Sequence, residues 1–231
     1  GLCLRNDNNQ AGYYNLIYDN GGYIINDDKT KSGMDDPKTV EAMEMLEGWI
    51  KDGVLPPIET MSENGEDVLL ESGKVAMVPQ GSWMIAAFRD NEYTAENCDC
   101  VELPKSATTG RRASLYNGLG WAAAANTEHP EEAWQLIEYL GSKEAQEKQA
   151  ELGVTMSAYT GTSEAWAKSA NFNLQAYINM MDDMEIRPYS RSTVTWENKN
   201  SEILKSVYSG DKTMADACKE MAEQMNEALA E

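Results

Sequence analysis

A glycine turn that presents a tryptophan is the feature of this sequence best suited to binding. Residues 71–83 pass from the end of a helix pattern through a short apolar run to Gly81-Ser82-Trp83. An indole that stands clear of small neighbours can stack on the C–H face of a weakly polar ring, such as a sugar, and exclude water. The competing interpretation makes Trp83 the first core residue of the following helix. Gln80 precedes the turn, and its amide is either a partner for hydroxyl groups or a solvated loop amide.

A second candidate segment runs from Tyr116 through Asn117 and two glycines to Trp121. Glycines allow backbone freedom at a hinge, and the segment opens an apolar run over residues 119–125. We expect Tyr116, Asn117 or Trp121 to reach a bound ligand.

A third candidate lies nearer the C-terminus, where Arg187, Tyr189 and Arg191 precede a helix pattern that contains Trp196. A guanidinium group donates several hydrogen bonds in a fixed geometry, so both arginines suit sugar hydroxyls. In a chain with 39 acidic residues they are equally suited to ordinary ion pairs. Trp196 is a candidate second stacking surface, and packing against the last helix is its alternative.

The turn at Asn20-Gly21-Gly22 is the weakest of the candidates. Two glycines permit positive φ and a close approach of the backbone to a ligand. A tight turn between a helix and a strand explains them as well, so we interpret the turn as structural and keep Asn20 as a lower-ranked contact.

Charge and composition narrow the function. The net charge is −20, from 39 acidic and 19 basic residues. Phosphate binding needs clustered Lys and Arg, so nucleic acid and anionic membrane surfaces are disfavoured as partners. Such an acidic surface mainly provides solubility, and attraction of a cationic solute such as a polyamine is the secondary interpretation.

The sequence contains no clear motif for a metal site, a cofactor site or a catalytic site. Cys98 and Cys100 are spaced too closely for a zinc knuckle, and His129, the only histidine, reads as a residue that precedes a helix. The chain has neither a GxSxG nor an HExxH motif. We therefore expect no metal, no cofactor and no enzyme, although carboxylates this numerous leave a glycosidase open. We expect Cys98 and Cys100 on one face of a strand, and Cys218 as a core residue of a helix.

Helices alternate with short strands, which predicts an α/β fold with layers of both. Asp36 and Pro37 mark the start of one helix and Gly53 its end, and Thr213 is the expected N-cap of the last helix. The expected helices span residues 37–53, 65–71, 82–89, 130–140, 142–153, 173–182, 194–208 and 214–229. The expected strands span residues 23–26, 75–79, 101–104 and 119–125.

The segments 71–83 and 116–121 resemble the extracellular solute-binding proteins of ABC importers, in particular the carbohydrate-binding family that includes maltose-binding protein. The resemblance implies a periplasmic-binding-protein type II lobe, a mixed sheet flanked by helices, together with a partial second lobe. Residues 1–114 and 171–231 would form the C-terminal lobe. Residues 115–170 would form the crossing segment and part of the N-terminal lobe, whose first half has no counterpart here.

The same resemblance implies a function. A carbohydrate would be captured between two lobes by hinge closure, with Trp83 and Trp196 stacking on it, and then delivered to the membrane permease subunits. The protein would be extracytoplasmic, at the cell surface or in the periplasm, and a lipoprotein, although the chain shows no signal-peptide pattern. The alternatives are a binding protein for a polyamine or an anion, and a cell-surface glycan hydrolase. An exposed strand edge at residues 119–125 would favour a homodimer.

Overall fold

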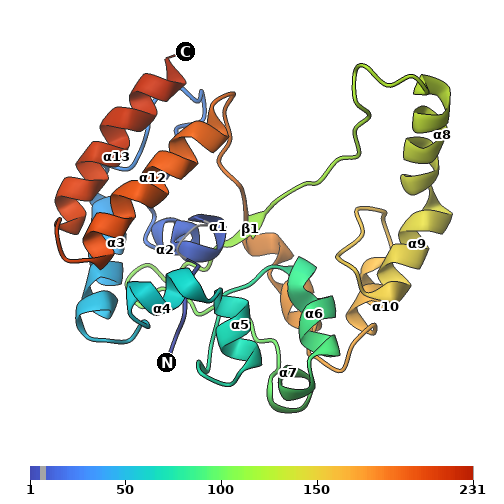
Figure 1. Ribbon diagram of the computed structural model, residues 1–231, viewed down its shortest axis with the longest axis horizontal. Helices are drawn as coiled ribbons and strands as arrows, with labels where there is room; N and C mark the ends of the chain where they lie inside the picture. The colour runs from blue at the N-terminus through green and yellow to red at the C-terminus, as the bar shows by residue number, and fades with distance from the viewer. Residues whose placement is uncertain (6–8, 231) are drawn as a thin grey trace. The chain divides into compact units, whose positions relative to one another are not determined.

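The computed structural model describes residues 1–5 and 9–230. The chain forms two compact units, each assembled from separate stretches of the sequence (Figure 1). Unit 1 comprises Gly1–Pro79, Leu103–Tyr116 and Asp182–Glu231, and unit 2 comprises Gln80–Glu102 and Asn117–Met181.

Three long helices build the core of unit 1: α3 (Pro37–Lys51), α12 (Thr193–Tyr208) and α13 (Met214–Leu229). Their starts follow the predicted caps. The Asp36 side chain accepts a hydrogen bond from the Lys38 N–H at 2.9 Å, and Thr213 Oγ1 accepts one from the Asp216 N–H at 3.2 Å. The shorter helices of this unit are α1 (Asn9–Gly12), α2 (Tyr14–Asp19), α4 (Ile58–Glu63) and α5 (Glu66–Glu71).

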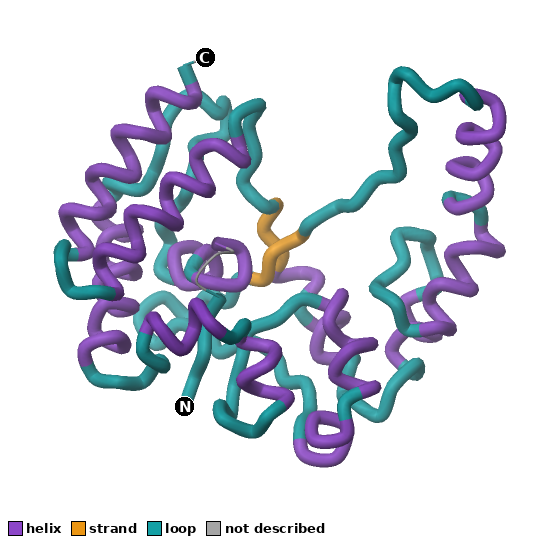
Figure 2. Tube along the Cα trace, viewed as in Figure 1, coloured by secondary structure: helices purple, strands orange, loops and turns teal. Residues whose placement is uncertain are grey.

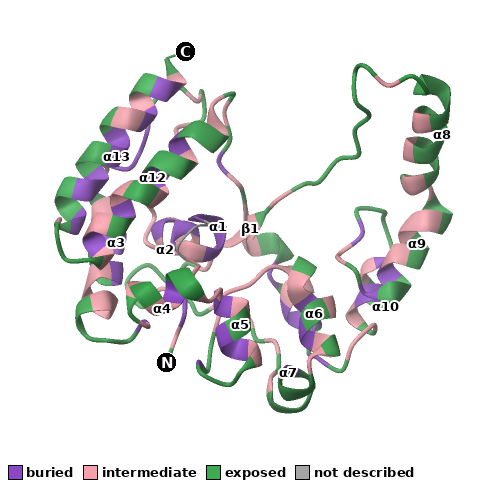
Figure 3. Ribbon diagram, viewed as in Figure 1, coloured by how far each residue is buried: buried purple, intermediate pink, exposed green. Residues whose placement is uncertain are grey.

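The last helix shows how sequence spacing produces this core. Met214, Cys218, Met221 and Met225 recur at helical spacing, and each is fully buried. The prediction that Cys218 is a core residue is confirmed. Figure 3 shows buried residues recurring along α12 and α13. The expected helix 194–208 is also formed, one residue longer at its start.

Two short parallel strands, β1 (Ser114–Tyr116) and β2 (Met184–Ile186), form the sheet of unit 1 (Figure 2). Their register pairs Tyr116 with Ile186. Two predicted strands are reduced to single bridges, between Leu2 and Met77 and between Ile25 and Ser32. The fold therefore contains much less strand than the sequence pattern predicted.

The predicted strands 101–104 and 119–125 are wrong within the part of the chain that the structure describes. Leu119 is 81% exposed, and the segment around it is irregular. A strand exists only with a hydrogen-bonded neighbour, and no described segment pairs with this one. Cys98 and Cys100 likewise lie in an irregular stretch after helix α7 (Glu92–Asn97), half-buried and as free thiols.

Unit 2 consists of helices and irregular segments. Its helices are the 3-10 turn η1 (Ser82–Met84), α6 (Ile85–Asp90), α7 (Glu92–Asn97), α8 (Pro130–Leu140), α9 (Lys143–Leu152), α10 (Ser163–Ala167) and α11 (Gln175–Asn179), and the 3-10 turn η2 (Met181–Asp183) follows at its boundary with unit 1. Ser142 caps α9, accepting from the Ala145 N–H at 3.3 Å, and Gly153 ends it at φ 67°, both as predicted. His129 precedes α8 as its N-cap residue.

The unit boundaries differ from the predicted domains. The division at 116/117 lies close to the predicted one at 114/115, but residues 80–102 and 171–181 belong to unit 2. Hydrogen bonds hold them there: Arg89 Nη1 donates to the Leu152 carbonyl at 3.1 Å, and Asn179 Nδ2 donates to Glu102 Oε1 at 2.8 Å. Which unit corresponds to which lobe of the family stays a prediction.

Candidate functional site

Trp83 lies in η1 of unit 2, and its side chain is 41% exposed. Its expected exposure is confirmed. The six-membered part of the indole lies directly against Gly81: a Cβ added at Gly81 would fall 2.1–2.4 Å from three of the ring carbons. One part of the ring is therefore covered by bare backbone, while 41% of the residue's surface is open to solvent.

Hydrogen bonds fix the turn that carries this indole. The Gly81 N–H donates to Gln80 Oε1 at 2.9 Å, and the Tyr177 hydroxyl donates to the Gln80 carbonyl at 3.1 Å. Ser82 Oγ and Thr155 Oγ1 share a hydrogen bond of 3.2 Å. Gln80 thus uses its amide oxygen to shape the turn. The predictions for this turn missed Tyr177 and Thr155, since both are distant in sequence.

Asn117 and Trp121 lie at the start of a long irregular segment of unit 2. Trp121 is 60% exposed and Asn117 is half-buried. Both are accessible to a ligand, but on a segment without the strand that was expected to position them.

In unit 1, the short sheet brings Tyr116 beside Arg187. The Arg187 N–H donates to the Tyr116 carbonyl at 3.0 Å, directly after the paired strands end. The Tyr116 side chain is 51% exposed. The sequence nominated both residues, and the parallel pairing of β1 and β2 makes them neighbours.

The Arg187 side chain is held by a carboxylate. Its Nη2 donates to Glu197 Oε2 at 2.6 Å, and Glu197 Oε1 accepts from the Tyr14 hydroxyl at 3.0 Å. Burial raises the pKa of Tyr14 well above its usual value, so this hydroxyl stays a donor. The ion-pair interpretation of Arg187 holds in this structure. Glu197 escaped the sequence prediction because 39 acidic residues give no single one a signal.

Tyr189 is 56% exposed and is covered on one ring face by a lysine. Lys29 Nζ lies 3.3 Å from the ring centroid, a cation–π contact. Lys29 has φ 59°, and Asn26 Oδ1 stabilises its turn by accepting from the backbone N–H groups of Thr30 and Lys31 at 2.9 Å each. Arg191, two residues beyond Tyr189, has an exposed side chain.

The prediction of Trp196 as a stacking surface is wrong. The side chain is fully buried, and its Nε1 donates to Ser190 Oγ at 3.0 Å. Its backbone carbonyl accepts from Gln224 Nε2 of α13 at 3.3 Å. The alternative, packing against the last helix, is correct, because one turn of helix places this indole on the core-facing side of α12.

Asn20 has a structural role. Its Nδ2 donates to the Lys38 carbonyl at 2.8 Å and to Glu41 Oε2 at 3.0 Å, which ties the end of α2 to α3. Both amide hydrogens are used within unit 1. Only the Oδ1 atom of Asn20 is left for a ligand, which agrees with the low rank of Asn20 among the predicted ligand contacts.

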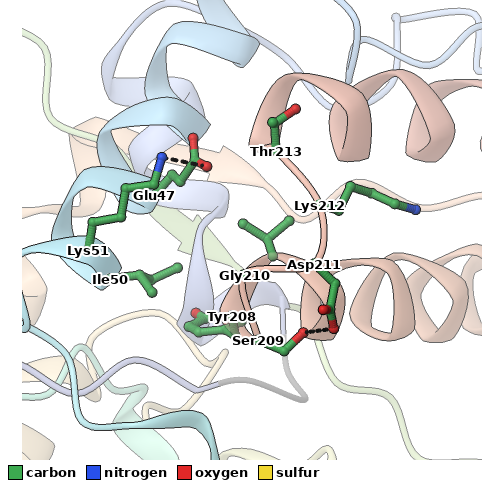
Figure 4. A pocket seen from close by; sticks show the side chains of 10 residues that line it. Glu47, Ile50, Lys51, Tyr208, Ser209, Gly210, Asp211, Lys212 and Thr213 are labelled. Carbon is green, nitrogen blue, oxygen red and sulfur yellow. Dashed lines mark hydrogen bonds and ion pairs between the residues drawn. The ribbon is translucent and has the colours of Figure 1, made fainter.

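A pocket of about 410 Å³ in unit 1 has none of these candidates in its lining (Figure 4). Its wall comes from the end of α3 and the connection between α12 and α13. Its polar groups pair with one another: Lys51 with Glu47 at 2.9 Å, and the Ser209 hydroxyl with Asp211 at 2.7 Å. Such a wall has few free groups to offer a ligand.

Residues 1–5 and 9–230 contain no group of three or more His, Cys, Asp or Glu side chains arranged to hold a metal ion. In the same part of the chain, no helix has both the length and the apolar character needed to cross a membrane.

Solved structures with the same fold are solute-binding proteins. An ABC substrate-binding protein from Listeria monocytogenes in complex with cycloalternan has a TM-score of 0.84 and 18% identity, over 100% of this chain and 58% of that one. A solute-binding protein from Thermotoga lettingae bound to alpha-D-tagatose has a TM-score of 0.82 and 22% identity, over 99% and 59%. The GacH receptor of Streptomyces glaucescens, studied with acarbose, has a TM-score of 0.81 and 18% identity, over 100% and 59%.

These likenesses show the fold: an α/β, periplasmic-binding-protein-like architecture of which this chain spans somewhat under three fifths. A comparison with curated protein sequences gave no match. The profile of the family described as "bacterial extracellular solute-binding protein" matches residues 5–182, which is most of the chain. The protein therefore belongs to the bacterial extracellular solute-binding proteins.

Proposed function

We propose that this chain is the larger part of the solute-binding subunit of an ABC importer and that its solute is a carbohydrate. The observation that carries the proposal is Trp83, an exposed indole on a turn fixed by hydrogen bonds to two other segments of unit 2. Related folds were solved with cycloalternan, tagatose and acarbose, which supports a sugar as the ligand class.

Within this proposal the candidate residues take different roles. Trp83 stacks on the sugar, and the exposed rings of Tyr116, Trp121 and Tyr189 are further apolar surfaces. Arg191 and Asn117 are the polar side chains most available to hydroxyl groups. Gln80, Asn20 and Arg187 act mainly by holding the structure. Hinge closure of two lobes on the ligand remains a prediction from the family resemblance.

The remaining parts of the proposal follow from the family. The protein would act outside the cytoplasm, deliver its sugar to ABC permease subunits and catalyse no reaction itself. Anchoring as a lipoprotein belongs to the same expectation. The rival solutes are a polyamine, which the net charge of −20 would attract, and an anion. A glycan hydrolase is the rival from another class.

We also propose self-association through the irregular segment of unit 2. The strand edge first expected to pair is not formed, but Leu119 and Trp121 are 81% and 60% exposed. Apolar side chains this accessible favour contact with a second copy. Sedimentation at rising concentration should show a dimer that Leu119→Ser weakens, and a strict monomer would contradict it.

Calorimetric titration with maltotriose, cycloalternan, spermidine and a simple anion tests the proposed solute class. We expect saturable binding of a sugar only. Trp83→Ala should weaken it about tenfold or more, because a stacked aromatic contributes on the order of 1–3 kcal/mol. The melting temperature should change little, since the side chain is 41% exposed.

Trp134→Ala is the matched control, because this tryptophan of α8 is 61% exposed and outside the candidate set. It should leave binding unchanged. Binding of spermidine or the anion alone would replace the sugar proposal, and release of reducing ends from a glycan would favour the hydrolase.

A further inference from the structure

The Trp83 indole lies against the residue two places before it, Gly81. A Cβ built on Gly81 would lie 2.1 Å from Cζ3, 2.2 Å from Cη2 and 2.4 Å from Cε3 of Trp83. No real Cβ approaches carbon atoms this closely, so the ring could not keep its position if residue 81 were anything but glycine. The three atoms belong to one edge of the six-membered ring.

The need for glycine here is steric. Gly81 has φ −84° and ψ 162°, an extended conformation that any residue adopts. Seven other glycines lie at positive φ, where their conformation alone explains them. At position 81 the backbone conformation would accept alanine, but the indole leaves no room for its Cβ.

The backbone beneath the ring cannot easily move away. The Gly81 N–H donates to Gln80 Oε1, its carbonyl accepts from the Met84 N–H at 3.1 Å, and Ser82 is bonded to Thr155. An added side chain would therefore displace the indole rather than the turn.

We propose that Gly81 is the positioning residue of the Trp83 stacking surface. It seats the ring against bare backbone, so that the indole is held in one orientation before a ligand arrives and receives that ligand only on its open side. A ring fixed in advance loses little conformational freedom on binding. The proposal rests on the proposed carbohydrate site for its ligand, but the seating itself does not depend on any ligand.

The seating is tested first without ligand. Trp83→Phe assigns the Trp83 indole N–H signal among the 6 tryptophans in a nitrogen–proton spectrum. Gly81→Ala should then move that signal and increase quenching of tryptophan fluorescence by acrylamide, while circular dichroism stays unchanged. An unmoved signal in a folded Gly81→Ala protein would overturn the proposal, whatever the ligand.

The consequence for binding is tested with maltotriose by a double-mutant cycle. Introduced into the original sequence, Gly81→Ala should weaken maltotriose binding about tenfold. Introduced into the Trp83→Ala variant, it should have little effect on binding, because the substitution acts through the indole. Gly48→Ala is the control: its Cβ would meet no described atom within 4 Å, and binding should be unchanged.

The outcomes separate the two proposals. A moved indole signal together with undiminished maltotriose binding, or an equal loss in the Trp83→Ala background, would overturn the positioning role. If the unchanged protein binds no sugar, the proposed function fails, and the spectrum alone decides whether Gly81 seats the indole.

Discussion

Trp83 of unit 2 and Trp196 of unit 1 differ sharply in burial, although both stand near the start of a helix. Trp83 is 41% exposed and rests on a glycine, whereas Trp196 is fully buried and hydrogen-bonded to Ser190. Trp196 lies on a helix of 16 residues that packs on two other long helices. Trp83 lies on a single 3-10 turn. An aromatic side chain is thus available to bind a ligand only where its own helix or turn does not bury it in the core.

A similar contrast in side-chain availability separates other residues of the two units. In unit 1, Arg187 and Asn20 are engaged with Glu197 and with α3. In unit 2, every residue of α8 is exposed or half-buried, including Trp134 at 61% (Figure 3). Arg187 and Asn20 thus serve the structure of unit 1, whereas Trp134 of unit 2 remains accessible to other molecules.

The largest expected effect is a loss of stability on truncation of the buried tryptophan, Trp196. Trp196→Ala should lower the free energy of unfolding of unit 1 by about 3–5 kcal/mol, because it removes a large side chain from a packed core. Urea unfolding followed by circular dichroism measures this loss. Trp83→Ala is the matched change and should cost far less stability. Equal losses for the two variants would contradict the assignment of Trp196 to the core and Trp83 to the surface.

A smaller effect concerns Asp19, at the end of α2. Burial raises the pKa of this carboxyl from 3.8 to about 6, and the nearby Asp183 raises it further. The Ala113 N–H, which donates to the carboxyl at 2.6 Å, and the charges of Arg111 and Arg112 lower this pKa, but their effect is smaller. The folded state therefore holds the proton more tightly than the unfolded state. The resulting stability is fully present below about pH 3.8 and is lost as the pH rises through about 6.

Asp19→Asn should remove that pH dependence. We expect the variant to be more stable than the unchanged protein by about 1–2 kcal/mol at pH 8, and similar to it near pH 4. Urea unfolding at a series of pH values provides the measurement. A variant that is less stable at pH 8 would show that the charged carboxylate stabilises unit 1.

The smallest expected effect concerns the stability that the exposed contact between Lys29 and Tyr189 gives to unit 1. Lys29→Met should lower stability by about 0.5–1 kcal/mol, because it removes the cation over the Tyr189 ring and keeps the length of the side chain. Lys31→Met, in the same turn, is the control and should have no effect. In a Tyr189→Leu background the loss at Lys29 should vanish. A loss that persists there would assign Lys29 a role in the turn alone.

Sequence alone determined the elements that depend on neighbours within a few residues. Asp36 with Pro37 started α3, Thr213 started α13, and Gly153 ended α9, since a cap acts on N–H or C=O groups of the adjacent turn. The spacing of Met214, Cys218 and Met221 likewise fixed the buried face of α13. The resemblance carried by residues 71–83 and 116–121 led to the correct family.

Tertiary structure decided what depends on partners far along the chain. Residues 119–125 have the apolar pattern of a strand but no described strand beside them, and β1 formed instead by pairing with β2, some 70 residues away. Whether Trp196 would stack or pack depended on α13 lying against α12. The contact between Lys29 and Tyr189 joins residues 160 positions apart. Local patterns fix helices and caps because their hydrogen bonds close within a turn, whereas pairing, burial and side-chain availability are set only when distant segments meet.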